Sequence, residues 1–85
     1  MAIPQLIELE VTRVSQRHQT AKGNFWIECA TNQGVVAVWG KAGNMANITA
    51  IEARTPPFKA TCGCIPSNWP EHAFWVPEYA TMRLA

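Results

Sequence analysis

The stretch NFWIECATNQGVVAVWGK, residues 24–41, decides the fold because it has the pattern of a β-hairpin. Its two arms flank a turn at residues 32–34, and we pair them so that Asn32 faces Val35. Because side chains on a strand point alternately to opposite faces, this pairing gives the hairpin two distinct faces. The face that we predict to be core carries Phe25, Ile27, Cys29, Val36 and Val38. The opposite face carries Trp26, Glu28, Ala30, Ala37, Trp39 and Lys41.

Two tryptophans therefore point away from the predicted core. Trp26 and Trp39 are expected to lie diagonal to each other, close enough to interact across the strands. A pairing shifted by one residue would bury Trp39 but would leave Val36 and Val38 exposed, so we favour the first pairing. Aromatic rings on the open face of a small sheet, with Lys41 beside them, are typical of a surface on which bases stack. The alternative is that this face packs against another subunit or a helix, since exposed aromatic patches mark interaction sites in general.

Elements on both sides of the hairpin are also predicted. A strand is expected over Gln5–Val14, with a bulge near Thr12–Val14 where the alternation changes phase, and a polar loop follows over Ser15–Gly23. After the hairpin, the spacing of apolar residues predicts a short helix over Asn44–Ile51 with Asn44 as its N-cap. The β-branched residues in this region leave a strand over Ile48–Ala53 as the competing prediction.

Two more strands are predicted towards the end of the sequence. Prolines at positions 56 and 57 end the preceding element, and Phe58–Cys64 has the alternation of a strand. Ile65–Glu71 is predicted to be a loop, and His72–Val76 a strand that Pro77 confines to an edge position or an end. Residues 78–85 would continue that strand or form a turn. Five short strands, with a helix between the third and fourth, predict an all-β Greek-key barrel of the OB-fold class. The second and third strands and two loops of this fold bind oligonucleotides or oligosaccharides.

The composition indicates one folded domain over residues 1–85. Hydrophobic residues make up 48% of the chain and charged residues 15%, below the ~25% of an average domain. The low charge and the four tryptophans argue against disorder and indicate a surface partly covered by partners, so we expect a homo-oligomer. The net charge of +1 excludes a strongly basic nucleic-acid-binding protein, but it leaves binding through stacking and a local basic stripe.

Sequence features that direct a chain to a membrane or out of the cell are not found. No basic segment is followed by an apolar run near the start, and no run of about 20 apolar residues exists, so we expect neither a secretory signal nor a membrane span. Three cysteines, an odd number, fit a reducing compartment better than a disulfide framework. We therefore expect a cytoplasmic protein.

The predicted third strand and the element after it resemble bacterial and phage single-stranded DNA-binding proteins. The run VVAVWGK, residues 35–41, ends an apolar strand in an aromatic residue, a glycine and a basic residue, and the short apolar element AGNMANI follows. In element order the resemblance covers about residues 5–76, and it extends to compact primosomal OB proteins. It implies that Trp26 and Trp39 stack on bases, that Lys41 meets a phosphate, and that DNA is favoured over RNA.

Other aromatic and basic residues extend the predicted interface. Trp69 lies in a loop between two prolines, where it could clamp a base or cover one end of the barrel. Trp75 points outward from the last predicted strand and could stack on a base or form a dimer interface. His18 is expected in the first loop, with an auxiliary contact to the ligand. The basic residues that we expect to neutralise phosphates, besides Lys41, are Arg13, Arg17, Lys22 and Lys59.

No catalytic or metal site is predicted. The chain contains no aspartate and none of the usual motifs of phosphate-binding loops or nucleophiles. Cys29, Cys62, Cys64 and His72 have the chemistry of a zinc site, but the C-x-C spacing of Cys62 and Cys64 differs from the common knuckle, and Cys29 fits an inward core position. We therefore predict a non-catalytic, cofactor-free protein that binds single-stranded nucleic acid. The main alternative is a protein-interaction or dimerisation module in a replication or repair complex.

Overall fold

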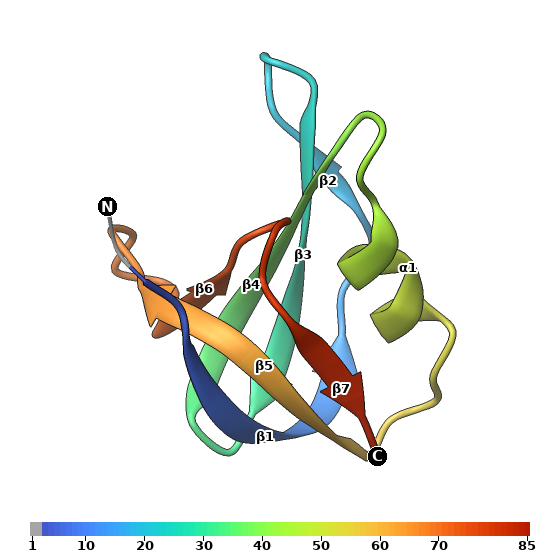
Figure 1. The fold of residues 1–85 in the computed structure, drawn as a ribbon, viewed down its shortest axis with the longest axis vertical. Helices are drawn as coiled ribbons and strands as arrows, with labels where there is room; N and C mark the ends of the chain where they lie inside the picture. Colours follow the sequence, from blue (N-terminus) through green and yellow to red (C-terminus); the bar gives the residue numbers. More distant parts are fainter. Residues whose placement is uncertain (1–2) are drawn as a thin grey trace.

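Five strands form a closed barrel, because the first and the last strand in the order of pairing also pair with each other. The computed structural model describes residues 3–85. The barrel strands follow the order β1-β3-β4-β6-β5, and β5 pairs back with β1 (Figure 1). Two short strands add to this barrel, since β2 pairs with β3 and β7 pairs with β5. The elements are β1 (Gln5–Val14), β2 (His18–Gln19), β3 (Asn24–Thr31), β4 (Gly34–Lys41), α1 (Ala46–Glu52), β5 (Phe58–Pro66), β6 (Phe74–Val76) and β7 (Met82–Leu84).

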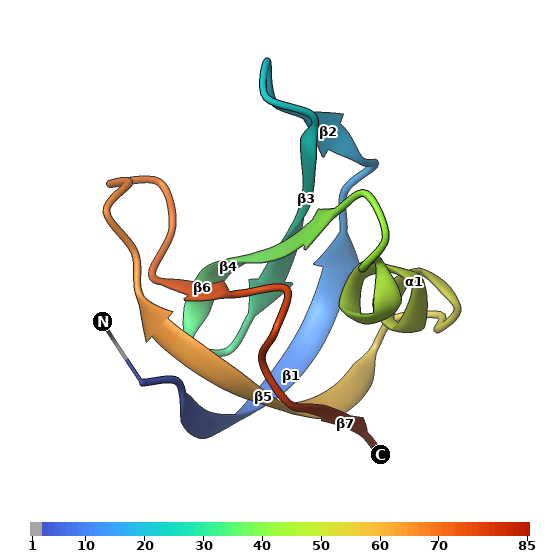
Figure 2. The same ribbon diagram turned by 45° about the horizontal axis from the view of Figure 1, so that its top comes forward.

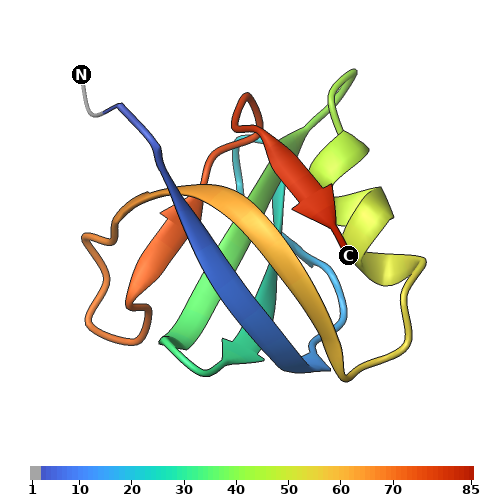
Figure 3. The ribbon, with the colours of Figure 1, turned by 60° about the horizontal axis from the view of Figure 1, so that its bottom comes forward.

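The bulge predicted in β1 lies where this strand passes from one neighbour to the other. Residues 5–11 pair with β5, as Figure 3 shows, and residues 11–14 pair with β3. The register with β3 shifts between Val11 and Arg13, which confirms the predicted bulge. A bulge bends a strand and increases its twist, so β1 can join two sides of the barrel.

The hairpin of β3 and β4 has the predicted faces but a different register. Trp26 pairs directly with Trp39 rather than diagonally, and the predicted pairing of Asn32 with Val35 is wrong by two residues. A shift of two residues keeps every side chain on its face, because the side-chain period of a strand is two. The competing register is wrong, since Val38 is buried in the core and Trp39 lies on the outer face with Trp26.

Side-chain hydrogen bonds explain why the turn lies one residue earlier than predicted. The Thr31 hydroxyl donates to the carbonyl oxygen of Gly34 at 2.7 Å and accepts from the backbone N–H of Gln33 at 3.0 Å. The side-chain oxygen of Asn32 accepts from the backbone N–H of Glu10 at 2.9 Å and ties the turn to β1. Gly34 has a φ of 103°, a conformation that favours glycine. Together these contacts close a two-residue turn at positions 32 and 33.

The barrel contains a parallel strand pair. β6 runs parallel to β4, with Ala37 opposite Trp75 and Val38 opposite Val76, and antiparallel to β5. The strand ends at Val76, directly before Pro77, so the predicted effect of that proline is confirmed as a strand end rather than an edge position. The predicted all-β barrel of OB type, with one short helix between its third and fourth barrel strands, is confirmed.

The core fills the barrel and the space beneath α1, which packs at one end (Figure 2). Ile48 and Ile51 of the helix are buried. Gly40 of β4 lies beneath the helix, where an added Cβ would come 2.9 Å from Cδ1 of Ile48 and 2.9 Å from Sδ of Met45. The buried apolar residues of this core are Leu9, Val11, Ile27, Cys29, Val36, Val38, Ile48, Ile51, Phe58, Ala60, Cys62, Cys64 and Val76.

The helix begins later than predicted, and Asn44 is not its N-cap. Met45 occupies the N-cap position without a side-chain hydrogen bond. The Nδ2 atom of Asn44 instead donates to the carbonyl oxygen of Glu78 at 3.2 Å. The amide therefore connects the segment before α1 to the segment after β6. The competing prediction of a strand over 48–53 is wrong, since residues 46–52 are helical.

Four other boundaries differ from the prediction. The loop over residues 15–23 contains the short strand β2, because its backbone pairs with β3. β5 continues to Pro66 along β6, and β6 begins at Phe74 rather than at residue 72. Residues 82–84 form β7 against β5. Within residues 3–85, no helix is long and apolar enough to cross a membrane.

Candidate functional site

All four tryptophans converge on one outer face of the barrel. Trp26 of β3, Trp39 of β4 and Trp75 of β6 come from three adjacent strands. Trp69 reaches them from the loop between β5 and β6, and every one of the four rings has its centroid within 6.0 Å of at least two others. We call these four residues the tryptophan cluster. The prediction that Trp26 and Trp39 share a face is confirmed, and the cluster adds the two other indoles to it.

Trp69 lies over the other three indoles. Its ring centroid is 5.6 Å from that of Trp26 and of Trp39, and 5.5 Å from that of Trp75, at interplanar angles of 81°, 70° and 89°. Such edge-to-face contacts are a favourable arrangement of aromatic rings. Trp69 is 37% exposed, whereas the other three are partly buried. It therefore covers the outer face formed by β3, β4 and β6 rather than an end of the barrel.

His18 extends the cluster from the first loop. It lies in β2 opposite Trp26, and the two rings are stacked with centroids 4.3 Å apart and an interplanar angle of 21°. The backbone pairing of β2 with β3 fixes this position, because it places the two side chains next to each other. One side of the Trp26 ring is therefore occupied by an imidazole that belongs to the protein.

His72 contacts the cluster and makes two side-chain hydrogen bonds that hold it in place. Its side chain is 2% exposed, and its ring centroid lies 5.5 Å from those of Trp26 and Trp69. The indole N–H of Trp75 donates to Nδ1 at 3.4 Å, and Nε2 lies 2.9 Å from Oε2 of Glu28. Because an indole only donates, Nδ1 is the acceptor and Nε2 carries the proton that Glu28 accepts. The imidazole thus connects β6 to β3.

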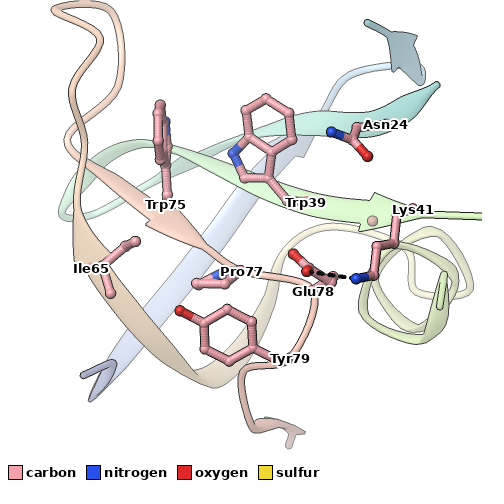
Figure 4. Close-up of a pocket in the computed structure, with 9 residues that line it drawn as sticks. Asn24, Trp39, Lys41, Ile65, Trp75, Pro77, Glu78 and Tyr79 are labelled. Carbon is pink, nitrogen blue, oxygen red and sulfur yellow. Dashed lines mark ion pairs between the residues drawn. The ribbon is translucent and has the colours of Figure 1, made fainter. Parts of the chain in front are cut away.

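A pocket of about 450 Å³ opens beside the cluster. Figure 4 shows Trp39 and Trp75 on one side of this pocket and Tyr79 on the other, with an ion pair between Lys41 and Glu78 at its edge. Tyr79 is 57% exposed. The Nε1 atom of Trp39 is buried and has no hydrogen-bond partner among residues 3–85. Aromatic walls, one cation and one anion therefore meet at this pocket.

Two of the predicted phosphate-binding residues are held in ion pairs. Arg17 binds Glu52 of α1 through two nitrogens, with Nη2 2.7 Å from Oε1 and Nε 2.9 Å from Oε2. The hydrogen bond to Arg17 is the main cause that lowers the pKa of Glu52 below its ordinary value, and the same bond raises the pKa of Arg17. Lys41 is less tightly held, since its Nζ lies 3.5 Å from Oε1 of Glu78.

The other predicted basic residues make no ion pair within the described part of the chain. Arg13 pairs with Ala30 and lines a small cavity together with Glu28, the residue that contacts His72. Lys22 is exposed in the turn that joins β2 to β3. Lys59 pairs with Glu10 on the β1–β5 surface, and the structure does not bring it to the cluster.

Sequence reasoning missed several residues of this site. Alternation places Glu28 on the outer face but does not assign it to the site, and no sequence pattern singles out Tyr79. The sequence indicates His72 only as a candidate zinc ligand. Alternation predicts that Trp75 points outward, but the position of His72 and the approach of Trp75 to the other indoles depend on the pairing of β6 with β4, which local alternation does not determine. The stacking of His18 on Trp26 similarly required the unpredicted strand β2.

The cysteines are free thiols of the core and not part of the site. Burial raises the pKa of Cys29 and of Cys62 to about 12, and that of Cys64 to about 11. Such thiols are poor nucleophiles, because the thiolate is the reactive form. In the described part of the chain, no three His, Cys, Asp or Glu side chains are grouped to hold a metal ion.

The fold and the site define a small OB-type barrel with an aromatic outer face. No protein-family model, curated protein or solved structure matches the chain. The resemblance to single-stranded DNA-binding proteins therefore stays a prediction based on the motifs quoted above.

Proposed function

We propose that this protein binds single-stranded nucleic acid, DNA in preference to RNA, without catalysing a reaction. The observation that carries this proposal is the convergence of four indoles and His18 on the outer face of β3, β4 and β6. Loops β1–β3 and β5–β6 border this face, which corresponds to the surface that OB-folds use for oligonucleotides. Stacking contributes ~1–3 kcal/mol per base, so a few stacked bases are sufficient for affinity of about 1 μM.

Electrostatic contacts play the smaller part in this proposal. The net charge is +1, and Arg17 and Lys41 already contact carboxylates. If Arg13, Lys22 and Lys41 each neutralise one phosphate, the logarithm of the binding constant falls with the logarithm of salt concentration with a slope of about −2. Lys59 lies on another surface and contributes only if the bound strand wraps around the barrel.

A docking site for a protein partner, including a second copy of this chain, is the second candidate. Two observations favour it. The indole rings already pack against one another in edge-to-face contacts. The ion pairs of Arg17 and Lys41 also reduce the free positive charge around these rings. An apolar protein interface depends far less on salt than phosphate contacts do. Salt dependence therefore separates the two functions.

The deciding experiment is a titration with a short oligo-dT strand, followed by tryptophan fluorescence, at about 50 mM and about 200 mM salt. We expect strong quenching, and an affinity that falls about fifteenfold between the two conditions. The double variant Trp26→Ala/Trp39→Ala should lose binding, with circular dichroism used to check that the barrel remains folded. Arg13→Ala should reduce the salt slope, whereas the charge-matched control Arg83→Ala on β7 should not. Absence of quenching at micromolar protein would contradict the proposal and assign the face to a protein partner.

A further inference from the structure

The pocket beside the tryptophan cluster has the size and walls of a site for a single planar group. Its volume of about 450 Å³ falls within the ~300–1,000 Å³ of small-molecule sites and is too small for several nucleotides. Trp39 and Trp75 face it from the strands, and the phenol ring of Tyr79 faces it from the segment after β6 (Figure 4). Ile65 and Pro77 complete the apolar lining. Aromatic rings on two sides suit a heterocyclic base.

The polar groups of the pocket carry both signs of charge. Nζ of Lys41 lies 3.5 Å from Oε1 of Glu78, which is longer than a charge-assisted hydrogen bond. A ligand that carries both an anionic group and a hydrogen-bond donor can therefore replace this contact. The side-chain amide of Asn24 lines the pocket and makes no hydrogen bond within residues 3–85. Trp39, whose ring lines the pocket, has a buried Nε1 that also finds no acceptor within residues 3–85. A purely cationic ligand would meet the ammonium group of Lys41, so these groups fit a nucleotide better.

We propose that this pocket takes one nucleotide of the bound strand and selects a base with an exocyclic amino group; this rests on the proposed function above. The base lies between the indoles and Tyr79, its amino group donates to the carboxylate of Glu78, and its phosphate binds Lys41. A carboxylate only accepts hydrogen bonds, so it pairs with the N4 amino group of cytosine. Uracil and thymine carry an acceptor oxygen at that position, which faces the carboxylate unfavourably. The tryptophan cluster stacks on any base, whereas this pocket supplies the preference.

The test compares labelled oligo-dC and oligo-dU of equal length by fluorescence anisotropy at pH 7.5. These two strands differ only in the group at C4 of the base and in the proton at N3. We expect the wild-type protein to bind oligo-dC about tenfold more tightly. Glu78→Gln should reduce this ratio below about threefold, because a glutamine side chain both donates and accepts. Glu8→Gln, an exposed carboxylate on β1, is the matched control and should keep the wild-type ratio.

A second pair of variants tests the aromatic wall. Tyr79→Ala should weaken binding of both strands about tenfold, and Tyr79→Phe should restore it, since the ring and not the hydroxyl does the stacking. Tyr79 is exposed, so neither change should unfold the barrel.

The outcomes separate this inference from the proposed function. The pocket assignment is overturned if wild type and Glu78→Gln have the same ratio of affinities for oligo-dC and oligo-dU, or if Tyr79→Ala binds both strands as tightly as wild type. In either case oligonucleotide binding itself stands. If neither strand binds at low salt, the proposed function fails and the pocket assignment fails with it.

Discussion

The imidazole ring of His18 is stacked on the indole ring of Trp26, at 4.3 Å between ring centroids. This contact joins the short strand β2 to the outer face of the barrel and covers one side of Trp26. A base that stacks on Trp26 must therefore use the other side of the ring or displace His18. The first loop of the barrel is consequently part of the candidate site and does not merely border it.

A double-mutant cycle measures this contact. We expect His18→Ala and Trp26→Ala to show a coupling of about 0.5–1.5 kcal/mol in the free energy of unfolding, the usual range for aromatic pairs. Chemical denaturation of the two single variants and the double variant gives the value. Gln19→Ala, a neighbouring change in β2, is the control and should show no coupling to Trp26. Additive effects of His18 and Trp26 would mean that the stacking contributes nothing to stability.

Trp69→Ala tests how the outermost indole acts. Because Trp69 is the most exposed ring of the cluster and belongs to a loop, the variant should fold, with an unchanged far-ultraviolet circular dichroism spectrum. We expect its affinity for oligo-dT to fall about tenfold through the loss of one stacking partner, and Trp69→Phe to lie between the variant and wild type. A rise in affinity would instead identify Trp69 as a side chain that occludes the site.

Glu52→Gln tests whether Arg17 is kept from phosphates by its ion pair. Removal of the carboxylate frees a guanidinium that is otherwise bound through two nitrogens. We expect the plot of the logarithm of the oligo-dT binding constant against the logarithm of salt concentration to become steeper by about 0.7. This is the value for one additional phosphate contact on a single strand. Glu10→Gln on β1 should leave the slope as it is. An unchanged slope in Glu52→Gln would remove Arg17 from the interface.

The buried cysteines predict how stability depends on alkaline pH. In the unfolded chain a thiol loses its proton near its ordinary pKa of 9.0, whereas in the folded protein burial raises the pKa of Cys29 and Cys62 to about 12 and of Cys64 to about 11. Between these limits the unfolded chain binds fewer protons, so the free energy of unfolding falls as the pH rises above about 9. Near neutral pH both states keep the protons and the thiols contribute no pH dependence.

Denaturation curves at several alkaline pH values check this expectation. The variant Cys29→Ala/Cys62→Ala should show a shallower decline above pH 9 than wild type, although it is less stable at neutral pH because it has lost buried sulfur atoms. Rapid labelling of all three thiols by iodoacetamide in the native protein would contradict the burial on which this prediction rests.

The sequence predicts the faces of the strands better than it predicts their pairing. Alternation fixes which side of β3 holds Ile27 and which holds Trp26, because a period of two follows from strand geometry. The register depends on hydrogen bonds at the turn, where Thr31 bonds to its own turn and Asn32 bonds to β1. The second of these contacts involves a strand that is distant in sequence, so a hairpin considered alone cannot supply it.

The residues of the candidate site likewise fall into two groups, those that alternation predicts and those that only the folded barrel brings together. Trp26 and Trp39 were predicted from alternation within one hairpin, and their placement on a shared face is confirmed. The gathering of Trp69, Trp75 and His72 depends on the parallel pairing of β6 with β4 and on the path of the β5–β6 loop. These are properties of the closed barrel. No local pattern in the sequence predicts the ion pair between Arg17 and Glu52, since the two residues lie far apart in the chain.

The parallel pairing of β4 with β6 also has a consequence for the folding of this protein. Residues 36–38 pair with residues 74–76, which are distant in the sequence, and such distant pairings form slowly. The β3–β4 hairpin can form early, with Trp26 beside Trp39, but Trp75 joins them only when β6 docks. Tryptophan fluorescence should therefore reach its native value only after β6 has docked, later than the formation of the β3–β4 hairpin. During synthesis, a nascent chain would acquire its full aromatic surface only once residue 76 has left the ribosome.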